Sequence, residues 1–210
     1  MISTGNKELD SFLDGYGKEV TLIYGPAATG KTTLCLLCCS RMLKDNKKVV
    51  YLDTENGFSV ERFIQICGAG YITMLDRLLV LQAQNFQDQC DRIDSIINIV
   101  GVDLIIVDSL GKHYRKYVIE NHSEANKKLD RQLRILTEIS RKGIPVVVTN
   151  HVSSNPETKE IRMVGGDMVK QWGKKVVRLE KEQRRVLFLE RPEERSIDFE
   201  IVQDGIRIVS

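Results

Sequence analysis

The residues from Gly25 to Thr33 have the types and spacing that point most directly to chemistry. They read Gly25-Pro26-Ala27-Ala28-Thr29-Gly30-Lys31-Thr32-Thr33, and the first eight satisfy the pattern G-x-x-x-x-G-K-[ST]. The glycines let the backbone curl so that its N–H groups face phosphates, and the start of a following helix adds partial positive charge. Lys31 would reach the β- and γ-phosphates, and Thr32 would place its hydroxyl on Mg²⁺. The motif therefore predicts binding of a nucleoside triphosphate with magnesium.

Three more polar side chains follow apolar runs of strand length. Asp108 ends the run Leu104-Ile105-Ile106-Val107, where P-loop proteins hold Mg²⁺ or its water, so we expect it to bind the metal. Glu55 follows Leu52-Asp53-Thr54 and is either a general base or an acid that caps the next helix. His151 follows Val148-Thr149-Asn150 and either contacts the terminal phosphate or is structural. Position alone leaves both alternatives open for Glu55 and for His151.

The elements that would position these residues alternate between strand and helix patterns. Continuous apolar runs predict strands, and amphipathic stretches predict helices; the strands are 20–24, 49–52, 78–81, 104–107 and 145–149, and the helices are 31–43, 60–67, 87–100 and 124–142. Apolar strands of this kind are typical of a parallel sheet covered on both faces. After residue 174, short strands predict an antiparallel extension at 176–179, 186–189, 197–201 and 206–209. We expect one α/β domain over residues 1–210.

Two segments, 111–126 and 151–166, have neither a strand nor a helix pattern. Both begin where a buried strand ends, which is where ligands sit in open α/β sheets. The whole chain carries a net charge of +2, yet residues 112–185 hold 18 basic and 9 acidic residues. Such an excess is typical of a nucleic-acid footprint or of a solvated lysine-rich surface, and charge alone does not separate the two.

Composition excludes several classes of protein. With 210 residues, 42% hydrophobic and 29% charged, the chain is neither collagen-like nor disordered. No apolar run approaches the ~20 residues of a membrane helix, and the first residues lack a signal-peptide core, so a cytoplasmic protein without membrane contact is expected. The clustered Cys35, Cys38 and Cys39 would share one helix face and are predicted to pack in the core.

Several segments together resemble a known family. They occur in the order Ile2-Ser3-Thr4-Gly5, the P-loop, Leu52-Asp53-Thr54-Glu55 with Glu61-Arg62-Phe63, Asp108-Ser109, Tyr114-Arg115, and Val148-Thr149-Asn150 with Gly165-Gly166. This arrangement resembles the ATPase core of the RecA/RadA recombinases, and in particular the short archaeal paralogues of RadA. The resemblance covers nearly the whole chain and implies a RecA-like P-loop fold.

The resemblance implies a function and a role for particular residues. Glu55 falls on the glutamate that activates water, ATP and Mg²⁺ are the cofactors, and residues 112–126 and 151–166 match two DNA-binding loops. Single-stranded DNA is the expected partner in homologous recombination and DNA repair. We expect phosphate contacts from Lys112, Arg115, Lys116, Lys159 and Arg162. Tyr114 either stacks on DNA bases or packs the loop under the sheet.

The sequence also departs from the family. It opens directly at Ile2-Ser3-Thr4-Gly5, without the N-terminal helical DNA-binding domain and the Phe-x-x-Ala docking segment of RadA. We therefore expect poor filament formation, weak ATPase activity and no strand exchange by the protein itself. His151 stands where the family usually has Gln, which should alter the coupling between ATP and the second loop.

Two alternative functions remain open at this point. KaiC-like regulatory ATPases share the Ser-Thr-Gly opening and the P-loop, but they usually carry paired acids after the second strand, whereas Glu55 stands alone before Asn56-Gly57. The other alternative is an ATP-bound adaptor for RadA or for a Holliday-junction resolvase. Salt-dependent binding of single-stranded DNA would separate a DNA-binding protein from a regulatory ATPase.

Overall fold

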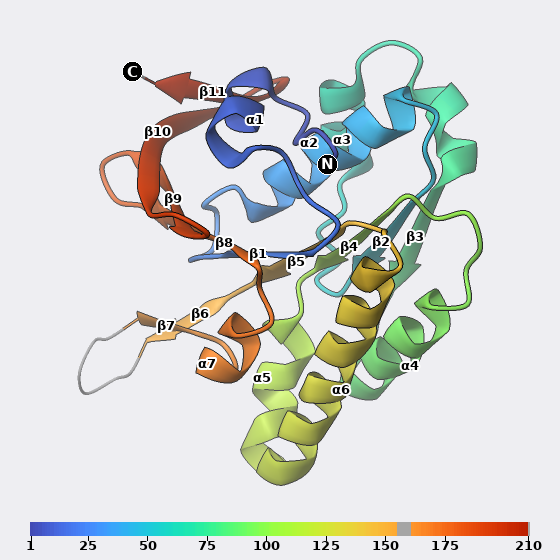
Figure 1. Ribbon diagram of the computed structural model, residues 1–210, viewed down its shortest axis with the longest axis vertical. Coiled ribbons are helices and arrows are strands. Elements are labelled where there is room, and N and C mark those ends of the chain that lie inside the picture. Colours follow the sequence, from blue (N-terminus) through green and yellow to red (C-terminus); the bar gives the residue numbers. More distant parts are fainter. Residues whose placement is uncertain (155–160, 210) are drawn as a thin grey trace.

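The computed structural model describes residues 1–154 and 161–209. A twisted sheet runs through the centre of the molecule (Figure 1). In its described part it has nine strands in the order β11-β10-β9-β8-β1-β5-β4-β2-β3. These are β1 (Val20–Tyr24), β2 (Val49–Asp53), β3 (Leu78–Gln82), β4 (Leu104–Asp108), β5 (Val146–Asn150), β8 (Lys175–Lys181), β9 (Arg185–Arg191), β10 (Arg195–Val202) and β11 (Gly205–Val209).

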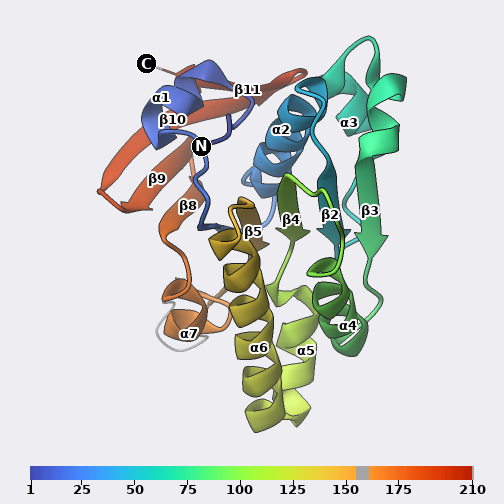
Figure 2. The same ribbon diagram turned by 45° about the vertical axis from the view of Figure 1, so that its right-hand side comes forward.

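Helices cover both faces of the parallel part of the sheet (Figures 1 and 2). One layer holds α1 (Lys7–Leu13), α2 (Lys31–Lys44), α3 (Val60–Cys67) and the 3₁₀ helix η1 (Tyr71–Arg77). The other holds α4 (Phe86–Ile96), α5 (Gly111–Glu120), α6 (His122–Arg141) and α7 (Gly166–Lys170). Two apolar cores result, one between the sheet and α2 (the α2 core) and one between the sheet and α6 (the α6 core). Successive strand residues point to opposite faces, so Tyr51 lies in the α2 core while its neighbours Val50 and Leu52 lie in the α6 core.

Pairing between the strands confirms the predicted α/β fold. Strands β1, β2, β3, β4, β5 and β8 pair in parallel, and β9, β10 and β11 pair antiparallel. The predicted strand and helix positions hold to within a few residues. The carboxyl ends of β1, β2, β4 and β5 consequently meet at one edge of the sheet, and this edge carries the P-loop, Glu55, Asp108 and His151.

The two segments predicted to be irregular are more ordered than expected. Residues 111–126 form α5 and the start of α6, because Tyr114, Tyr117 and Val118 lie at helical spacing and pack against the α6 core. In the second segment β6 (Val152–Ser154) pairs antiparallel with β7 (Ile161–Met163). The short elements α1, η1 and α7 were not predicted, since a few residues carry little periodic signal.

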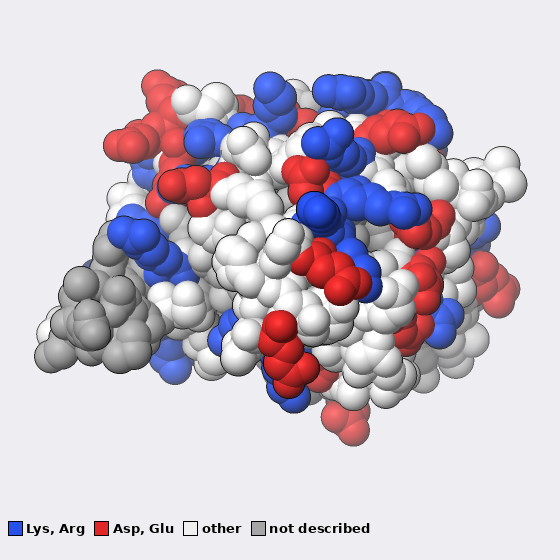
Figure 3. All heavy atoms as spheres, turned by 90° about the horizontal axis from the view of Figure 1, so that it is seen from below, with Lys and Arg blue, Asp and Glu red and all other residues white. Residues whose placement is uncertain are grey.

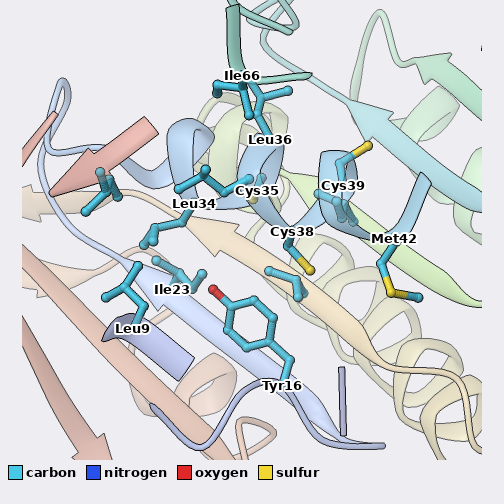
Figure 4. Close-up of a cluster of buried hydrophobic side chains, with 14 of the residues drawn as sticks. Leu9, Tyr16, Ile23, Leu34, Cys35, Leu36, Cys38, Cys39, Met42 and Ile66 are labelled. Atoms are coloured by element: carbon cyan, nitrogen blue, oxygen red, sulfur yellow. The ribbon is translucent and has the colours of Figure 1, made fainter. Parts of the chain in front are cut away.

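The cysteine-rich helix α2 contributes to the α2 core (Figure 4). Cys35, Cys38 and Cys39 are free thiols with no exposed surface, beside Leu34 and Met42. Burial raises the pKa of all three thiols. Their predicted role in packing is confirmed, and they are poorly suited to nucleophilic chemistry.

Among the described residues, no helix combines the length and the apolar character needed to cross a bilayer.

Candidate functional site

The phosphate-binding loop joins β1 to α2 and is packed tightly against the C-terminal strands. A Cβ atom on Gly25 would lie 2.3 Å from the carbonyl oxygen of Leu179. Gly30 has a φ of +114°, and a Cβ there would also approach Ile201 Cδ1 to 3.2 Å. Gly30 gives the first turn of α2 no side-chain cap, so the amide N–H groups of that turn remain available to an anion.

Lys31 is held inside this loop. Its side chain is 7% exposed, and Nζ donates hydrogen bonds to the carbonyl oxygens of Gly25 (2.9 Å) and Pro26 (2.7 Å). Burial lowers the pKa of Lys31, while the nearby carboxylates of Asp108 and Glu55 act in the opposite direction. The ammonium group therefore lies within the curl of the loop, where the motif requires it for phosphate binding.

Asp108 is the most heavily hydrogen-bonded carboxylate at this edge of the sheet. It accepts hydrogen bonds from the hydroxyls of Thr32 (2.8 Å), Tyr51 (2.8 Å) and Thr149. Burial and the adjacent Asp108 carboxylate raise the pKa of Tyr51. Tyr51 and Thr149 were not identified from the sequence; the signal available was a polar atom within an otherwise apolar strand. Both hydroxyls orient Asp108 toward Thr32.

A magnesium ion fits this pair only together with a nucleotide. Thr32 and Asp108 offer the oxygen ligands that Mg²⁺ prefers, and Mg²⁺ commonly binds one or two protein groups plus substrate phosphates. Within residues 1–154 and 161–209, no cluster of three or more His, Cys, Asp or Glu side chains could hold a metal by itself. The donor set therefore matches a phosphate-bridged magnesium ion.

Glu55 and His151 are in direct contact. The Glu55 carboxylate is hydrogen-bonded to His151 Nε2, and the two side chains are 25% and 15% exposed. Burial by itself would raise the pKa of Glu55, but the hydrogen bond to His151, the nearby Ser109 hydroxyl and the charge of Lys112 outweigh it and lower the pKa to about 2. Glu55 is thus an ionised carboxylate that is already engaged by the residue expected to sense the terminal phosphate.

One cavity of about 380 Å³ gathers these groups. It is lined by Ala27, Ala28, Gly30, Lys31, Thr32, Thr33, Glu55, Asp108, His151, Arg185 and Ile201. The structure therefore brings together the P-loop with the three polar side chains predicted from the strand ends. Arg185 and Ile201 were not predicted, because they come from the antiparallel extension and no local motif marks them.

A larger cavity of about 720 Å³ lies on the other side of the P-loop, between β6–β7, α7 and β8. Four of its lining residues contact one another: Glu190 accepts hydrogen bonds from the Tyr24 hydroxyl (2.8 Å) and from Arg178 (2.9 Å), and it pairs with Lys170 (2.8 Å). Because it lacks Lys31, Thr32 and Asp108, we place the phosphate chemistry in the smaller cavity.

The two segments after β4 and β5 touch each other beside the nucleotide cavity. A Cβ on Gly111 would lie 2.3 Å from Asn150 Oδ1 and 3.0 Å from Val164 Cγ1. Asn150 Nδ2 donates to the carbonyl of Val164 (2.8 Å), whose N–H donates to the carbonyl of His151 (2.9 Å). Hydrogen bonds and packing contacts thus connect His151 to the start of α5 and to the end of the second segment.

The predicted DNA contacts fall into separate groups. Lys112, Arg115 and Lys116 lie on α5, and no ion pair of theirs is found in the described part of the chain. Arg162 is exposed on β7, and Lys159 lies outside the described residues.

Tyr114 does not have the exposed position that base stacking requires. It is 6% exposed, its ring packs edge-on against Phe86 with centroids 5.9 Å apart, and its hydroxyl donates to Asn126 (2.6 Å). In this structure Tyr114 is therefore packed in the interior and is not placed for a base contact. The sequence could not show this, because the orientation of Tyr114 depends on the α5 helix and its packing on α4.

The excess of basic residues between 112 and 185 is partly neutralised in three dimensions. Three of these cations pair with acids that lie outside residues 112–185: Arg131 with Asp94 (2.9 Å), Lys170 with Glu190 (2.8 Å) and Arg184 with Asp198 (3.4 Å). Figure 3 shows Lys and Arg interspersed with Asp and Glu over the end of the molecule seen from below. The charge count along the sequence thus overstates the basic field, and the unpaired residues of α5 become the sharper candidates.

Three comparisons with known proteins agree with this geometry. The sequence model of the Rad51 family matches residues 1–205. The chain is 38% identical to the DNA repair and recombination protein RadB of Thermococcus kodakarensis over 100% of both chains, and 36% identical to that of Methanoculleus marisnigri over 99% of this chain and 98% of its relative. A crystal structure of the RadB recombinase superposes with a TM-score of 0.85 at 38% identity, covering 100% of both chains.

Proposed function

This chain belongs to the Rad51 family, and on that premise we propose that it is an ATP-binding, DNA-binding protein of homologous recombination and DNA repair. The single observation that carries the proposal is the cavity that joins the P-loop to Glu55, Asp108 and His151. When bound there, ATP with Mg²⁺ would supply the triphosphate and the Lewis acid of phosphoryl transfer.

Each polar side chain of the cavity has a distinct task in this proposal. Lys31 binds phosphate as a point charge, and Thr32 with Asp108 holds the metal. Glu55 orients water and accepts its proton, for which an ionised carboxylate is required. His151 reports on the nucleotide by exchanging its contact with Glu55 for one with the terminal phosphate.

The contact between Glu55 and His151 supports slow hydrolysis. In this structure the carboxylate that should activate water is bonded to an imidazole instead. Separating the pair before each turnover costs free energy, because a charge-assisted hydrogen bond of this kind is worth about 1.5–3 kcal/mol. We therefore propose weak ATPase activity and a switching role, without strand exchange by the protein itself.

The packing beside the cavity supports control of DNA binding by the nucleotide. His151, Asn150 and Val164 are joined by hydrogen bonds, and Gly111 packs against the last two. Release of His151 would shift the residues that lead into α5, which carries Lys112, Arg115 and Lys116. DNA, preferably single-stranded, is the proposed ligand of that helix and of Arg162.

Two other proposals start from the same nucleotide site. In one, the protein is an ATP-bound adaptor that holds RadA or a Holliday-junction resolvase. In the other, it is a KaiC-like regulatory ATPase that acts on proteins. The unpaired basic residues of α5 favour DNA over both.

The experiment that tests the proposal is steady-state ATP hydrolysis with and without single-stranded DNA, at several salt concentrations. We expect slow turnover that DNA changes at low salt and that loses this response as salt rises. Turnover that is indifferent to DNA at every salt concentration would favour the regulatory ATPase.

A further inference from the structure

Arg185 lies at the edge of the nucleotide cavity and has no role in the function proposed above. It begins β9 directly opposite Phe199 of β10. Residues directly opposite in an antiparallel pair point to the same face of the sheet. A Cβ on Gly30 would lie 3.5 Å from the Phe199 ring, so this face rests against the phosphate-binding loop. The strand register therefore fixes Arg185 beside the loop, and its side chain lines the cavity.

The guanidinium group of Arg185 has no protein partner among the described residues. Its Nε is buried and makes no hydrogen bond, and none of the described carboxylates pairs with it. The preceding residue behaves differently, since Arg184 points to Asp198 at 3.4 Å. A buried donor without a partner is costly, and the cost is relieved when an acceptor arrives.

The cavity lining suggests which acceptor this is. Lys31 is bonded to loop carbonyls and His151 to Glu55, and each must give up a contact to bind a ligand, whereas Arg185 has no such contact to lose. A guanidinium presents a planar fork of N–H donors that matches phosphate oxygens in a bidentate manner. The ligand that the neighbouring loop is built to take carries such oxygens.

We propose that Arg185 is a phosphate-binding residue of the nucleotide site, supplied by the same subunit from the antiparallel extension. The inference rests on the proposed ATP site and assigns it a second cation besides Lys31. It also gives the β9–β10 ladder a task beyond completing the sheet, because the ladder positions a charged side chain across the mouth of the P-loop.

The test is a titration of the full chain with a fluorescent ATP analogue and with the matching ADP analogue, each with Mg²⁺. Arg185→Gln keeps much of the side-chain stem but removes the charge, and Arg184→Gln is the matched control at the preceding residue. We expect Arg185→Gln to weaken ATP binding about 10-fold or more and Arg184→Gln to change it less than about twofold. Arg185→Lys should recover part of the loss.

The outcomes separate this inference from the function on which it rests. If the unaltered protein binds no nucleotide, the proposed ATP site itself fails. If it binds ATP and Arg185→Gln binds equally well, only the role of Arg185 is overturned. Thermal unfolding without nucleotide is measured for each variant, and Arg185→Lys serves as the informative variant if Arg185→Gln does not fold.

Discussion

The nucleotide cavity and the exposed side of α5 are both functional candidates, but they are built in opposite ways. In the cavity, Asp108 accepts three hydrogen bonds and Lys31 donates two, so each atom has a fixed place. On α5, Arg115 and Lys116 extend into solvent without an ion-pair partner in the described structure. Phosphoryl transfer needs preorganised groups, whereas sequence-tolerant DNA binding needs solvent-exposed cations that can neutralise phosphates.

This difference predicts that the cavity should be far more sensitive to single substitutions than α5. The most severe single change is Lys31→Ala, which removes the buried ammonium group from the loop. We expect ATP affinity to fall by at least ~100-fold, since the ammonium group can no longer donate charge-assisted hydrogen bonds to the phosphates. Isothermal titration with ATP and Mg²⁺ measures this, with Lys44→Ala at the far end of α2 as the control.

The next change tests whether the cavity is catalytic as well as binding. Glu55→Gln keeps the shape of the side chain but cannot accept a proton from water. We expect ATP affinity to stay within about threefold of the unaltered protein and turnover to fall about 100-fold. A hydrolysis assay at saturating ATP decides this, and unchanged turnover would remove Glu55 from the mechanism.

A third change tests the exposed basic side of α5. Substituting Lys112, Arg115 and Lys116 together by Ala should weaken single-stranded DNA binding about 10-fold at low salt. The slope of log affinity against log salt should become shallower by ~0.7 for each DNA phosphate that is no longer neutralised. The control removes the same number of cations by substituting Arg131, Arg134 and Lys142 together by Ala, because all three are already paired with carboxylates. Equal weakening in both variants would show that general charge, not α5, determines binding.

The smallest expected effect concerns the pKa of Glu55. His151→Ala should raise this pKa from about 2 toward its ordinary value of 4.5, because the variant cannot form the main hydrogen bond to the carboxylate. A depressed pKa stabilises the fold above the ordinary value, and that stabilisation is lost as the pH falls toward the folded pKa.

Carboxyl-carbon NMR between pH 3 and pH 6 measures this, with Glu55→Gln used to assign the signal. Glu55 should not titrate in the unaltered protein in that range, and it should titrate in His151→Ala. A Glu55 signal that titrates near pH 4.5 in both proteins would show that the contact with His151 does not control the carboxylate.

How much of the molecule the sequence could predict depends on how local each signal is. The P-loop is a contiguous motif, and the parallel strands carry continuous apolar runs, so both were predicted in place. The partnership of Glu55 with His151 joins residues 96 apart in the sequence, and Arg185 reaches the cavity only through strand register. These relations belong to tertiary structure, and no spacing in the sequence expresses them.

The burial of Tyr114 is another feature that depends on tertiary structure. Its neighbours in the sequence are charged, which favours an exposed segment, yet the helix turns its ring toward Phe86. Tyr114, Tyr117 and Val118 are at helical spacing, but three apolar positions among charged residues are too few to predict a helix. Which side of α5 faces solvent could therefore be decided only from the packed structure.

We propose that nucleotide in the cavity controls DNA binding at α5 and at the segment after β5. The most direct test is fluorescence anisotropy of labelled single-stranded DNA, with and without ATP and Mg²⁺, across a series of salt concentrations. We expect binding that weakens steeply with salt and that changes when nucleotide is added. Absence of binding at low salt in both states would contradict the claim and would direct attention to protein partners of a nucleotide switch.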